Sequence, residues 1–167
     1  AVGITALLQS AILSANIEIF DLASKKKELS GMGTTVVAAY VSNEFTVISH
    51  IGDSRAYLID TEVTQLTRDH SVVQFLIENG KLTYEEARVH PRRNVITRAL
   101  GIEAEVLVDS GEFKIKEGQS LLLCSDGLSN FITKEEIKDI FDNFDIQDVV
   151  KALVDKANNN GGGDNIT

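Results

Sequence analysis

The segment from residue 34 to residue 67 constrains the fold most, because it holds four short β-prone runs in succession. The runs cover residues 34–41, 44–51, 55–59 and 63–67. Turn-forming residues separate them: Ser42-Asn43 is a hairpin signal, and Asp60-Thr61 is a weaker one. Since short connections join neighbouring antiparallel strands, the pattern predicts an antiparallel meander.

Helical patterns lie on both sides of this β-rich segment. Apolar residues at three-to-four spacing predict helices over residues 2–24, 70–79 and 146–157. Two further helix starts carry the capping-box pairs Thr83 with Glu86 and Thr133 with Glu136. Two more strands are expected over residues 106–113 and 120–125. Strands and helices form separate clusters and do not alternate, so the order predicts an α+β fold.

Composition limits the classes of partner. The chain has 167 residues and a net charge of −9 at pH 7, and it shows no basic stripe of the kind that binds a phosphate backbone. We expect no nucleic-acid partner. No uninterrupted apolar run reaches the length of a membrane span, so no membrane partner is expected either. The single cysteine, Cys124, cannot form an intramolecular disulfide and fits a reducing, cytoplasmic compartment.

Three aspartates lie next to glycine where strands are expected to begin or end. Asp53 sits between two strand patterns, Asp126 follows an apolar strand, and Asp164 precedes a β-prone ending. Glycine allows tight turns and close approach, and a strand fixes the position of a carboxylate. If these side chains converge, they form an oxygen-only site suited to Mg²⁺ or Mn²⁺. For any one of them alone, an ordinary turn is the favoured interpretation.

Other polar side chains have weaker functional readings. Arg92 and Arg93 could attract a phosphorylated substrate or could belong to a solvated loop. Arg98 could meet phosphate, although a salt bridge is favoured. His70 could be functional, but a lone histidine is more often structural. Asp69 is expected to cap the helix that follows it. Cys124 is expected to fill a buried strand, in preference to acting as a nucleophile.

Six ordered motifs resemble those of bacterial metal-dependent Ser/Thr phosphatases of the PPM, or type 2C, family. The motifs are Gly31-Met32-Gly33-Thr34-Thr35, Gly52-Asp53-Ser54-Arg55-Ala56-Tyr57, Leu66-Thr67-Arg68-Asp69-His70-Ser71, Asn94-Val95-Ile96-Thr97-Arg98-Ala99-Leu100-Gly101, Ser125-Asp126-Gly127-Leu128 and Gly163-Asp164-Asn165-Ile166-Thr167. The resemblance covers essentially the whole chain, and the stretch His90-Pro91-Arg92-Arg93-Asn94 is similar to the bacterial branch.

The resemblance implies two packed antiparallel β-sheets flanked by helices, a four-layer α-β-β-α sandwich, as one domain over residues 1–167. It implies a mobile flap at about residues 79–94. Asp126 and Asp164 resemble ligands of a two-metal centre, and Asp53 with Asp126 resembles the ligand pair of a third metal. The implied cofactors are two to three Mg²⁺ or Mn²⁺ ions, which activate a water for attack on phospho-Ser or phospho-Thr. Phosphoproteins, including a Ser/Thr kinase, are the implied substrates.

The chain departs from this family at its start. The family's first strands, with a phosphate-binding arginine and an Asp-Gly-Met-Gly-Gly-type motif that bridges the two metals, have no counterpart here. The chain therefore resembles an N-terminally truncated domain, incomplete at both ends, and is expected to be inactive alone. Loss of two strands is expected to expose a sheet edge and favour self-association. Two alternatives stay open: a pseudo-phosphatase that only binds partners, and a hydrolase of small phosphoesters.

Overall fold

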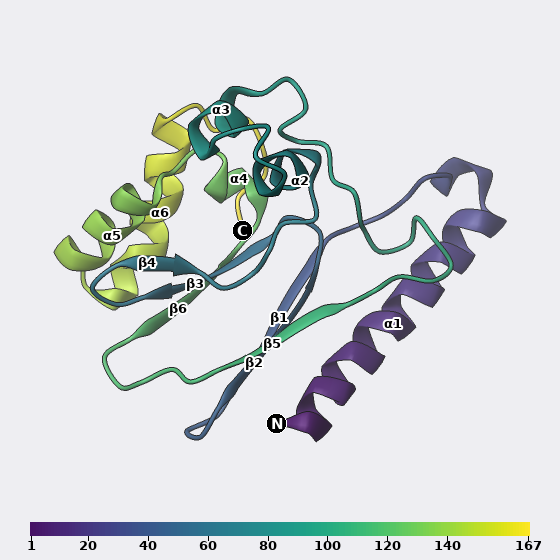
Figure 1. Cartoon of the computed structure of the whole chain (residues 1–167), viewed down its shortest axis with the longest axis horizontal. Helices are drawn as coiled ribbons and strands as arrows, with labels where there is room; N and C mark the ends of the chain where they lie inside the picture. The colour runs from purple at the N-terminus through teal and green to yellow at the C-terminus, as the bar shows by residue number, and fades with distance from the viewer. The chain divides into compact units, whose positions relative to one another are not determined.

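The computed structural model describes all residues from 1 to 167, and Figure 1 traces them from N-terminus to C-terminus. The elements follow in the order α1 (Val2–Lys25), η1 (Lys27–Leu29), β1 (Val36–Val41), β2 (Thr46–Ile51), β3 (Arg55–Ile59), β4 (Val63–Gln65), α2 (Val72–Glu78), α3 (Tyr84–Val89), β5 (Asp109–Phe113), β6 (Ser120–Cys124), α4 (Asp126–Ser129), α5 (Lys134–Asn143) and α6 (Ile146–Asn159).

The chain forms two compact units, and each unit is built from two separate segments of the sequence. The first contains Ala1–Ser54 and Arg68–Lys114, and the second contains Arg55–Thr67 and Ile115–Thr167. The backbone thus leaves the first unit after Ser54, returns to it at Arg68, and leaves it again after Lys114. A single domain over residues 1–167 with a flap at 79–94 stays a prediction.

A three-stranded antiparallel sheet in the order β1-β2-β5 forms the centre of the first unit. Val36 pairs with Ile51 at one end of β1, and Ser49 pairs with Ser110 between β2 and β5. Helix α1 contacts β2 and β1. The core consists of Ile12, Ile51 and Leu100, with Ala15, Ile19, Val36, Val106 and Val108 packed around them. The face of α1 that contains Ile12 and Ile19 therefore covers the sheet, as its apolar spacing predicted.

Helix α1 is long and apolar enough to cross a bilayer, by length and composition only. This finding corrects the expectation that no segment reaches that length. Core helices of soluble proteins and signal sequences near an N-terminus meet the same criterion. Within its own unit, α1 is bonded through Asn16. The Asn16 amide, which is 1% exposed, donates to the carbonyl oxygens of Glu103 and Ala104 and accepts from the Gly101 N–H at 2.8 Å. These bonds attach α1 to the loop that precedes β5.

The second unit has a three-stranded antiparallel sheet in the order β4-β3-β6 and the helices α4, α5 and α6. Arg55 of β3 pairs with Cys124 of β6, and Ile59 pairs with Ser120. The buried core of this unit is Tyr57, Ile59, Val63, Cys124, Leu128, Ile132, Ile137, Ile140, Val149, Leu153 and Ala157. Cys124 is buried among these residues and forms no disulfide, as expected for a residue that fills the core.

The predicted single meander is wrong, because β2 and β3 belong to different sheets. β2 pairs with β1 and β5, while β3 pairs with β4 and β6. The chain changes sheets at Gly52-Asp53-Ser54, where Gly52 has a φ of +101°. The two hairpins were predicted correctly because their turns are local. The pairings with β5 and β6 join residues more than fifty positions apart, and no local pattern encodes them.

Local helix signals were correct in two of three cases. Thr83 with Glu86 and Thr133 with Glu136 both form complete capping boxes. The cap of α2 was misassigned: Ser71, not Asp69, is the N-cap, and its hydroxyl accepts from the Gln74 N–H at 3.2 Å. Asp69 lies two residues too early for this role.

Candidate metal site and the hydrogen bonds around it

Asp126 is held at the junction of β6 and α4 in the second unit. It is the first residue of α4 and follows the N-cap Ser125 directly. Its carboxylate is half-buried and accepts from the Asn130 side-chain amide at 3.3 Å. A carboxylate in the first turn of a helix interacts favourably with the partial positive charge there. The strand and the short helix together fix the backbone of Asp126, as the apolar run before it predicted.

Asp164 lies in an exposed segment that contacts this junction. The expected strand after it is absent, which is a correction, since residues 164–167 have no regular secondary structure. Hydrogen bonds with Ser125 nevertheless hold the segment. Ser125 N–H donates to the Thr167 carbonyl oxygen at 3.1 Å, Thr167 N–H donates to Ser125 Oγ at 3.2 Å, and Ser125 Oγ lies 3.4 Å from the Asn165 carbonyl oxygen. The segment therefore runs beside Ser125 without forming a strand.

Gly127 allows the two aspartate segments to meet. A Cβ atom at Gly127 would lie 2.1 Å from the Asn165 carbonyl oxygen and 2.9 Å from its carbonyl carbon. Only a residue without a side chain fits such an approach. Gly127 follows Asp126 and Asn165 follows Asp164, so the contact places the residues next to both aspartates against each other. Convergence of the Asp126 and Asp164 carboxylates into an oxygen donor set for Mg²⁺ or Mn²⁺ stays a prediction.

Asp53 belongs to the first unit, in the turn after β2. It is half-buried, and its neighbours Gly52 and Ser54 are buried. Ser54 Oγ lies 2.8 Å from Thr35 Oγ1, and a Cβ atom at Gly52 would meet the Thr35 Cγ2 atom at 2.3 Å. The turn is thus packed tightly against Thr35. Convergence of Asp53 with Asp126 and Asp164 stays a prediction.

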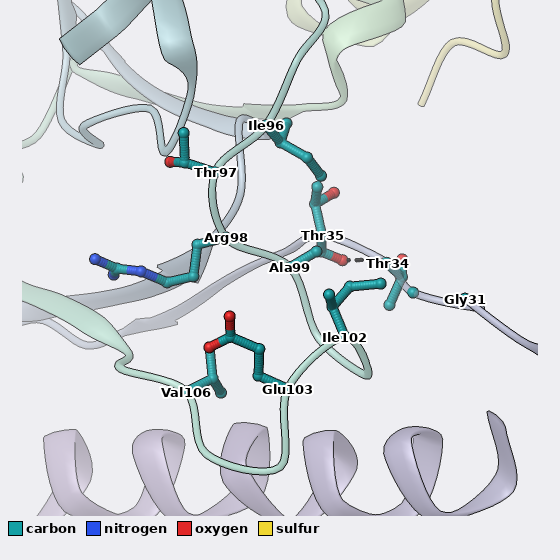
Figure 2. Close-up of a pocket in the computed structure, with 11 residues that line it drawn as sticks. Gly31, Thr34, Thr35, Ile96, Thr97, Arg98, Ala99, Ile102, Glu103 and Val106 are labelled. Carbon is teal, nitrogen blue, oxygen red and sulfur yellow. Dashed lines mark hydrogen bonds between the residues drawn. The ribbon is translucent and has the colours of Figure 1, made fainter. Parts of the chain in front are cut away.

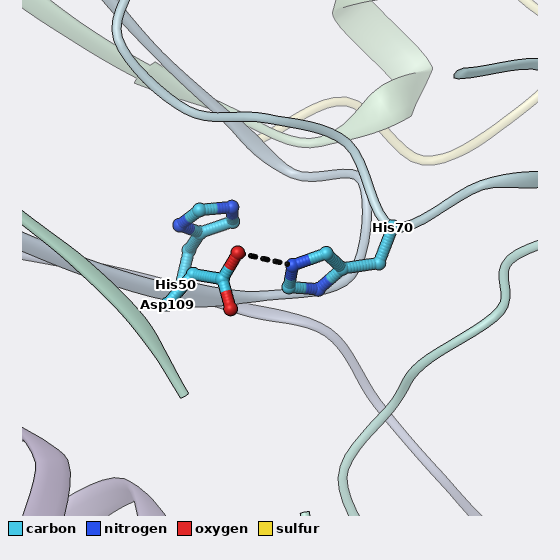
Figure 3. Close-up of side chains that lie close together, drawn as sticks. All are labelled: His50, His70 and Asp109. Carbon is cyan, nitrogen blue, oxygen red and sulfur yellow. Dashed lines mark ion pairs between the residues drawn. The ribbon is translucent and has the colours of Figure 1, made fainter. Parts of the chain in front are cut away.

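His50, His70 and Asp109 form a second cluster, in the first unit, that the sequence did not predict (Figure 3). The two imidazole rings stack with centroids 4.9 Å apart and planes 14° from parallel. His70 Nε2 lies 3.1 Å from Asp109 Oδ2, and both histidines are buried. Histidine and carboxylate side chains at such separations are the donor set of many transition-metal sites.

The hydrogen bonds of this cluster favour a structural role over metal binding. His50 Nε2 lies 2.9 Å from the Arg68 carbonyl oxygen and donates to it, and His70 Nδ1 accepts from the Gly52 N–H at 3.0 Å. The Arg98 guanidinium lies 3.0 Å from His70 Nε2 and 2.7 Å from Asp109 Oδ1. A cation is therefore already present beside Asp109. The salt bridge also confirms the favoured reading of Arg98.

Charge and burial decide the protonation of this cluster. Burial lowers the pKa of His70 from its usual 6.5, and the nearby Arg98 guanidinium lowers it further, while the hydrogen bond with Asp109 opposes both. Burial raises the pKa of Asp109, but the hydrogen bonds from His70 and Arg98 outweigh burial and hold it below its usual 3.8. At neutral pH the cluster thus consists of a neutral imidazole, a carboxylate and a guanidinium.

A cavity of about 540 Å³ lies near this cluster in the first unit, and Figure 2 shows the residues that line it. Ile96, Ile102 and Val106 give it apolar walls, and Arg98 extends away from them toward its partners. None of the three predicted metal-binding aspartates lines this cavity. Arg92 and Arg93 lie outside it as well, in an exposed stretch after α3.

The fold defines a class: an α+β protein with two three-stranded antiparallel sheets and helices beside them. Comparison with known proteins makes this class specific. Residues 4–158 match the family described as Protein phosphatase 2C. The chain belongs to the protein phosphatase 2C family, as the six motifs predicted.

Named relatives and solved structures agree with this assignment. The chain is 42% identical to the serine/threonine phosphatase Stp of Listeria innocua over 162 residues, which are 96% of this chain and 64% of that protein. It is 45% identical to protein phosphatase PhpP of Streptococcus pneumoniae over 139 residues, 82% of this chain and 56% of that protein. The crystal structure of Stp1 from Staphylococcus aureus matches with a TM-score of 0.93 at 36% identity, covering 96% of this chain and 64% of that one.

The likeness confirms the predicted fold class. It also shows that the chain matches only part of the length of its relatives. The chain spans 64% of the length of the Listeria relative. A structure of the PstP catalytic domain in complex with two manganese ions covers 97% of this chain with a TM-score of 0.87 and 35% identity, and the match takes in 68% of that domain. The manganese ions belong to the PstP structure. Metal binding by Asp53, Asp126 and Asp164 of this chain stays a prediction.

Proposed function

We propose that the protein is a metal-dependent Ser/Thr phosphatase that hydrolyses phosphoproteins. The observation that carries the proposal is the contact of Gly127 with Asn165, because it places the Asp126 and Asp164 segments against each other. The Listeria relative's name as a serine/threonine phosphatase supports the reaction class. The manganese ions of the PstP structure support Mg²⁺ or Mn²⁺ as cofactors.

Divalent cations bound at these carboxylates would supply a nucleophilic water near neutral pH and neutralise charge on the phosphoryl oxygens. In this proposal Asp126 and Asp164 would provide ligands of a two-metal centre, and Asp53 would be a further metal ligand. The role of the protein is to hold these oxygens in place before substrate arrives, which the β6–α4 junction does for Asp126. Arg92 and Arg93, both exposed, attract the anionic substrate.

We expect the 167-residue chain assayed on its own to be inactive. Its sequence contains no Asp-Gly-Met-Gly-Gly-type motif, the one that the family resemblance associates with the carboxylate bridging two metals. Without that ligand the negative charges near Asp126 would repel with less compensation, and metal would bind weakly. The test is hydrolysis of p-nitrophenyl phosphate by this chain with Mn²⁺. Robust turnover would contradict the expectation of inactivity.

Intact protein containing this chain tests the reaction itself. We expect it to dephosphorylate a phospho-Ser or phospho-Thr peptide with Mn²⁺, and Asp126→Asn to lower kcat/KM at least about 100-fold, because a metal ligand is lost. Metal binding without turnover on any substrate would favour a pseudo-phosphatase that binds partners. Turnover of small phosphoesters with no activity on phosphopeptides would favour a small-molecule hydrolase.

Partners and compartment follow from the same proposal. The phosphoprotein substrates include a Ser/Thr kinase, and the protein acts in the cytoplasm. Self-association proceeds through β1, which is an edge strand in the order β1-β2-β5 and carries exposed Tyr40 and Val41. An unpaired edge can add a strand from a second chain. Light scattering should give a mass above that of one chain, and Val41→Lys should reduce it. A monomer at every concentration argues against this edge as an interface.

A further inference from the structure

Gly52 is the residue before Asp53, and both of its backbone polar groups are hydrogen-bonded to one residue, His70. The Gly52 N–H donates to His70 Nδ1 at 3.0 Å, and the Gly52 carbonyl oxygen accepts from the His70 N–H at 3.0 Å. Gly52 is buried, and its φ is +101°. A buried backbone amide that loses its hydrogen-bond partner destabilises the fold. His70 therefore fixes the direction in which the chain enters Asp53.

The Gly52 bond also fixes the tautomer of His70. Since Nδ1 accepts a hydrogen bond, it carries no proton, and the neutral ring must carry its proton on Nε2. Nε2 faces Asp109 Oδ2 at 3.1 Å and donates to it (Figure 3). A neutral imidazole is required, which agrees with the lowered pKa of His70.

Arg98 completes the arrangement and lies beside both Asp109 and His70, with its Nη1 3.0 Å from His70 Nε2. Its Nη1 lies 2.7 Å from Asp109 Oδ1 and 3.0 Å from the Leu107 carbonyl oxygen. The guanidinium thus orients the carboxylate, the carboxylate orients the imidazole, and the imidazole holds Gly52. The hydrogen bonds therefore run from Arg98 through Asp109 and His70 to Gly52.

We propose that His70 is a positioning residue for Asp53, holding the Gly52–Asp53 peptide through Nδ1 while Asp109 and Arg98 hold the imidazole. The proposal rests on the proposed function, in which Asp53 is a metal ligand. Histidine more often plays this part beside a metal by bonding a ligand side chain, whereas here it bonds the backbone before the ligand. Loss of such an outer partner lowers metal affinity about 10–100-fold.

Two substitutions separate the two ends of the imidazole. In His70→Asn, the amide oxygen takes the place of Nδ1 and still accepts from Gly52, but the bond to Asp109 is lost. In His70→Gln, the amide nitrogen takes the place of Nε2 and still donates to Asp109, but the Gly52 acceptor is lost. Both variants remove the ring and its stacking with His50, so a merely structural role predicts equal effects.

Mn²⁺ binding followed by electron paramagnetic resonance of the free ion measures the outcome. We expect His70→Gln to weaken binding about 10–100-fold and His70→Asn to weaken it clearly less. Hydrogen exchange in the metal-free chain should show Gly52 losing protection in His70→Gln and keeping it in His70→Asn. A ¹⁵N spectrum of the wild-type ring should show the proton on Nε2. Equal affinities for the two variants, or a proton on Nδ1, would overturn the proposal.

Asp53→Asn separates this proposal from the function on which it rests. If Asp53→Asn weakens Mn²⁺ binding and His70→Gln does not, the metal role of Asp53 stands and the positioning role falls. If Asp53→Asn leaves binding unchanged, Asp53 is no metal ligand and the proposed role of His70 falls with it. In that case, the exchange of the Gly52 amide still reports whether the hydrogen bond to His70 exists.

Discussion

The turn at Asp53 and the junction at Asp126 present metal-binding candidates in two different ways. Asp126 is held by regular secondary structure, since it begins α4 two residues after β6 ends at Cys124. Asp53 lies outside any helix or strand, and its turn is held by Thr35 and by His70, both distant in sequence. The comparison teaches that one carboxylate is placed by local elements and the other by tertiary hydrogen bonds. Disturbing distant residues should therefore affect the Asp53 turn far more than the Asp126 junction.

The largest effect on stability is expected for Gly52→Ala. An added Cβ would lie 2.3 Å from Thr35 Cγ2, and a φ of +101° is strained for alanine. Backbone strain and overpacking together cost about 2–5 kcal/mol of unfolding free energy. Gly118→Ala is the matched control, because its φ of +86° brings strain with nothing within 4 Å. Chemical denaturation should show a clearly greater loss for Gly52→Ala. Equal losses would mean that the packing against Thr35 contributes nothing.

At the Asp126 junction the corresponding change is Gly127→Ala. The new Cβ would approach the Asn165 carbonyl oxygen to 2.1 Å, so the 164–167 segment must move away. We expect a loss of about 1–3 kcal/mol and weaker Mn²⁺ binding. The control is Gly163→Ala, whose Cβ would meet only Phe131 at 3.4 Å. Calorimetric unfolding and a Mn²⁺ titration check both. An unchanged Mn²⁺ affinity in Gly127→Ala would show that the contact between Gly127 and Asn165 is not needed for metal binding.

Acid should first destabilise the hydrogen bonds of His70 and Asp109, which hold the turn at Asp53. The folded pKa of His70 is below its usual 6.5, so the unfolded chain binds the proton first and stability falls as pH drops below 6.5. The folded pKa of Asp109 is below 3.8, so a second loss follows as pH drops below that value. Unfolding free energy measured between pH 8 and pH 5 should fall in wild type and fall less in His70→Asn. Parallel curves would show that His70 does not cause the loss.

The smallest effect is expected for the ion pair of Arg68 and Glu78. The hydrogen bond from Arg68 holds the pKa of Glu78 at about 2 instead of 4.5, yet the side chains are 52% and 33% exposed. Solvent screening limits such pairs to about 0.2–1 kcal/mol. Glu78→Gln should cost this much at pH 7, and the difference from wild type should disappear as pH falls from 4.5 toward 2. Glu44→Gln, at an exposed turn, is the control. A loss above 2 kcal/mol would show that Glu78 contributes more to stability than an exposed ion pair can.

Local patterns explain what the sequence could predict. The capping boxes at Thr83 and Thr133 involve residues three positions apart, and the apolar strand before Asp126 is contiguous. The sheet assignment of β2 and β3 depended on pairings with β5 and β6, which no local pattern encodes. The segment after Asp164 has β-prone residues but is hydrogen-bonded to Ser125 in place of forming a strand.

The hydrogen bonds around Asp53 were beyond sequence reasoning for a similar cause. His70, Arg98 and Asp109 lie in a loop, another loop and the start of β5, without a shared spacing. The one available signal was that His70 and Arg98 each belong to a family motif, and each was read singly. Only the tertiary structure shows that the two motifs meet at Asp109.

The most direct test of the central claim is a Mn²⁺ titration of the chain and three variants by electron paramagnetic resonance. The account predicts that Asp126→Asn and Asp164→Asn each weaken binding at least about tenfold, because each removes a charged oxygen ligand. Asp155→Asn makes the same change of charge on the exposed face of α6 and should leave binding as it is. Equal affinities for all four proteins would contradict a metal site at the adjoining Asp126 and Asp164 segments.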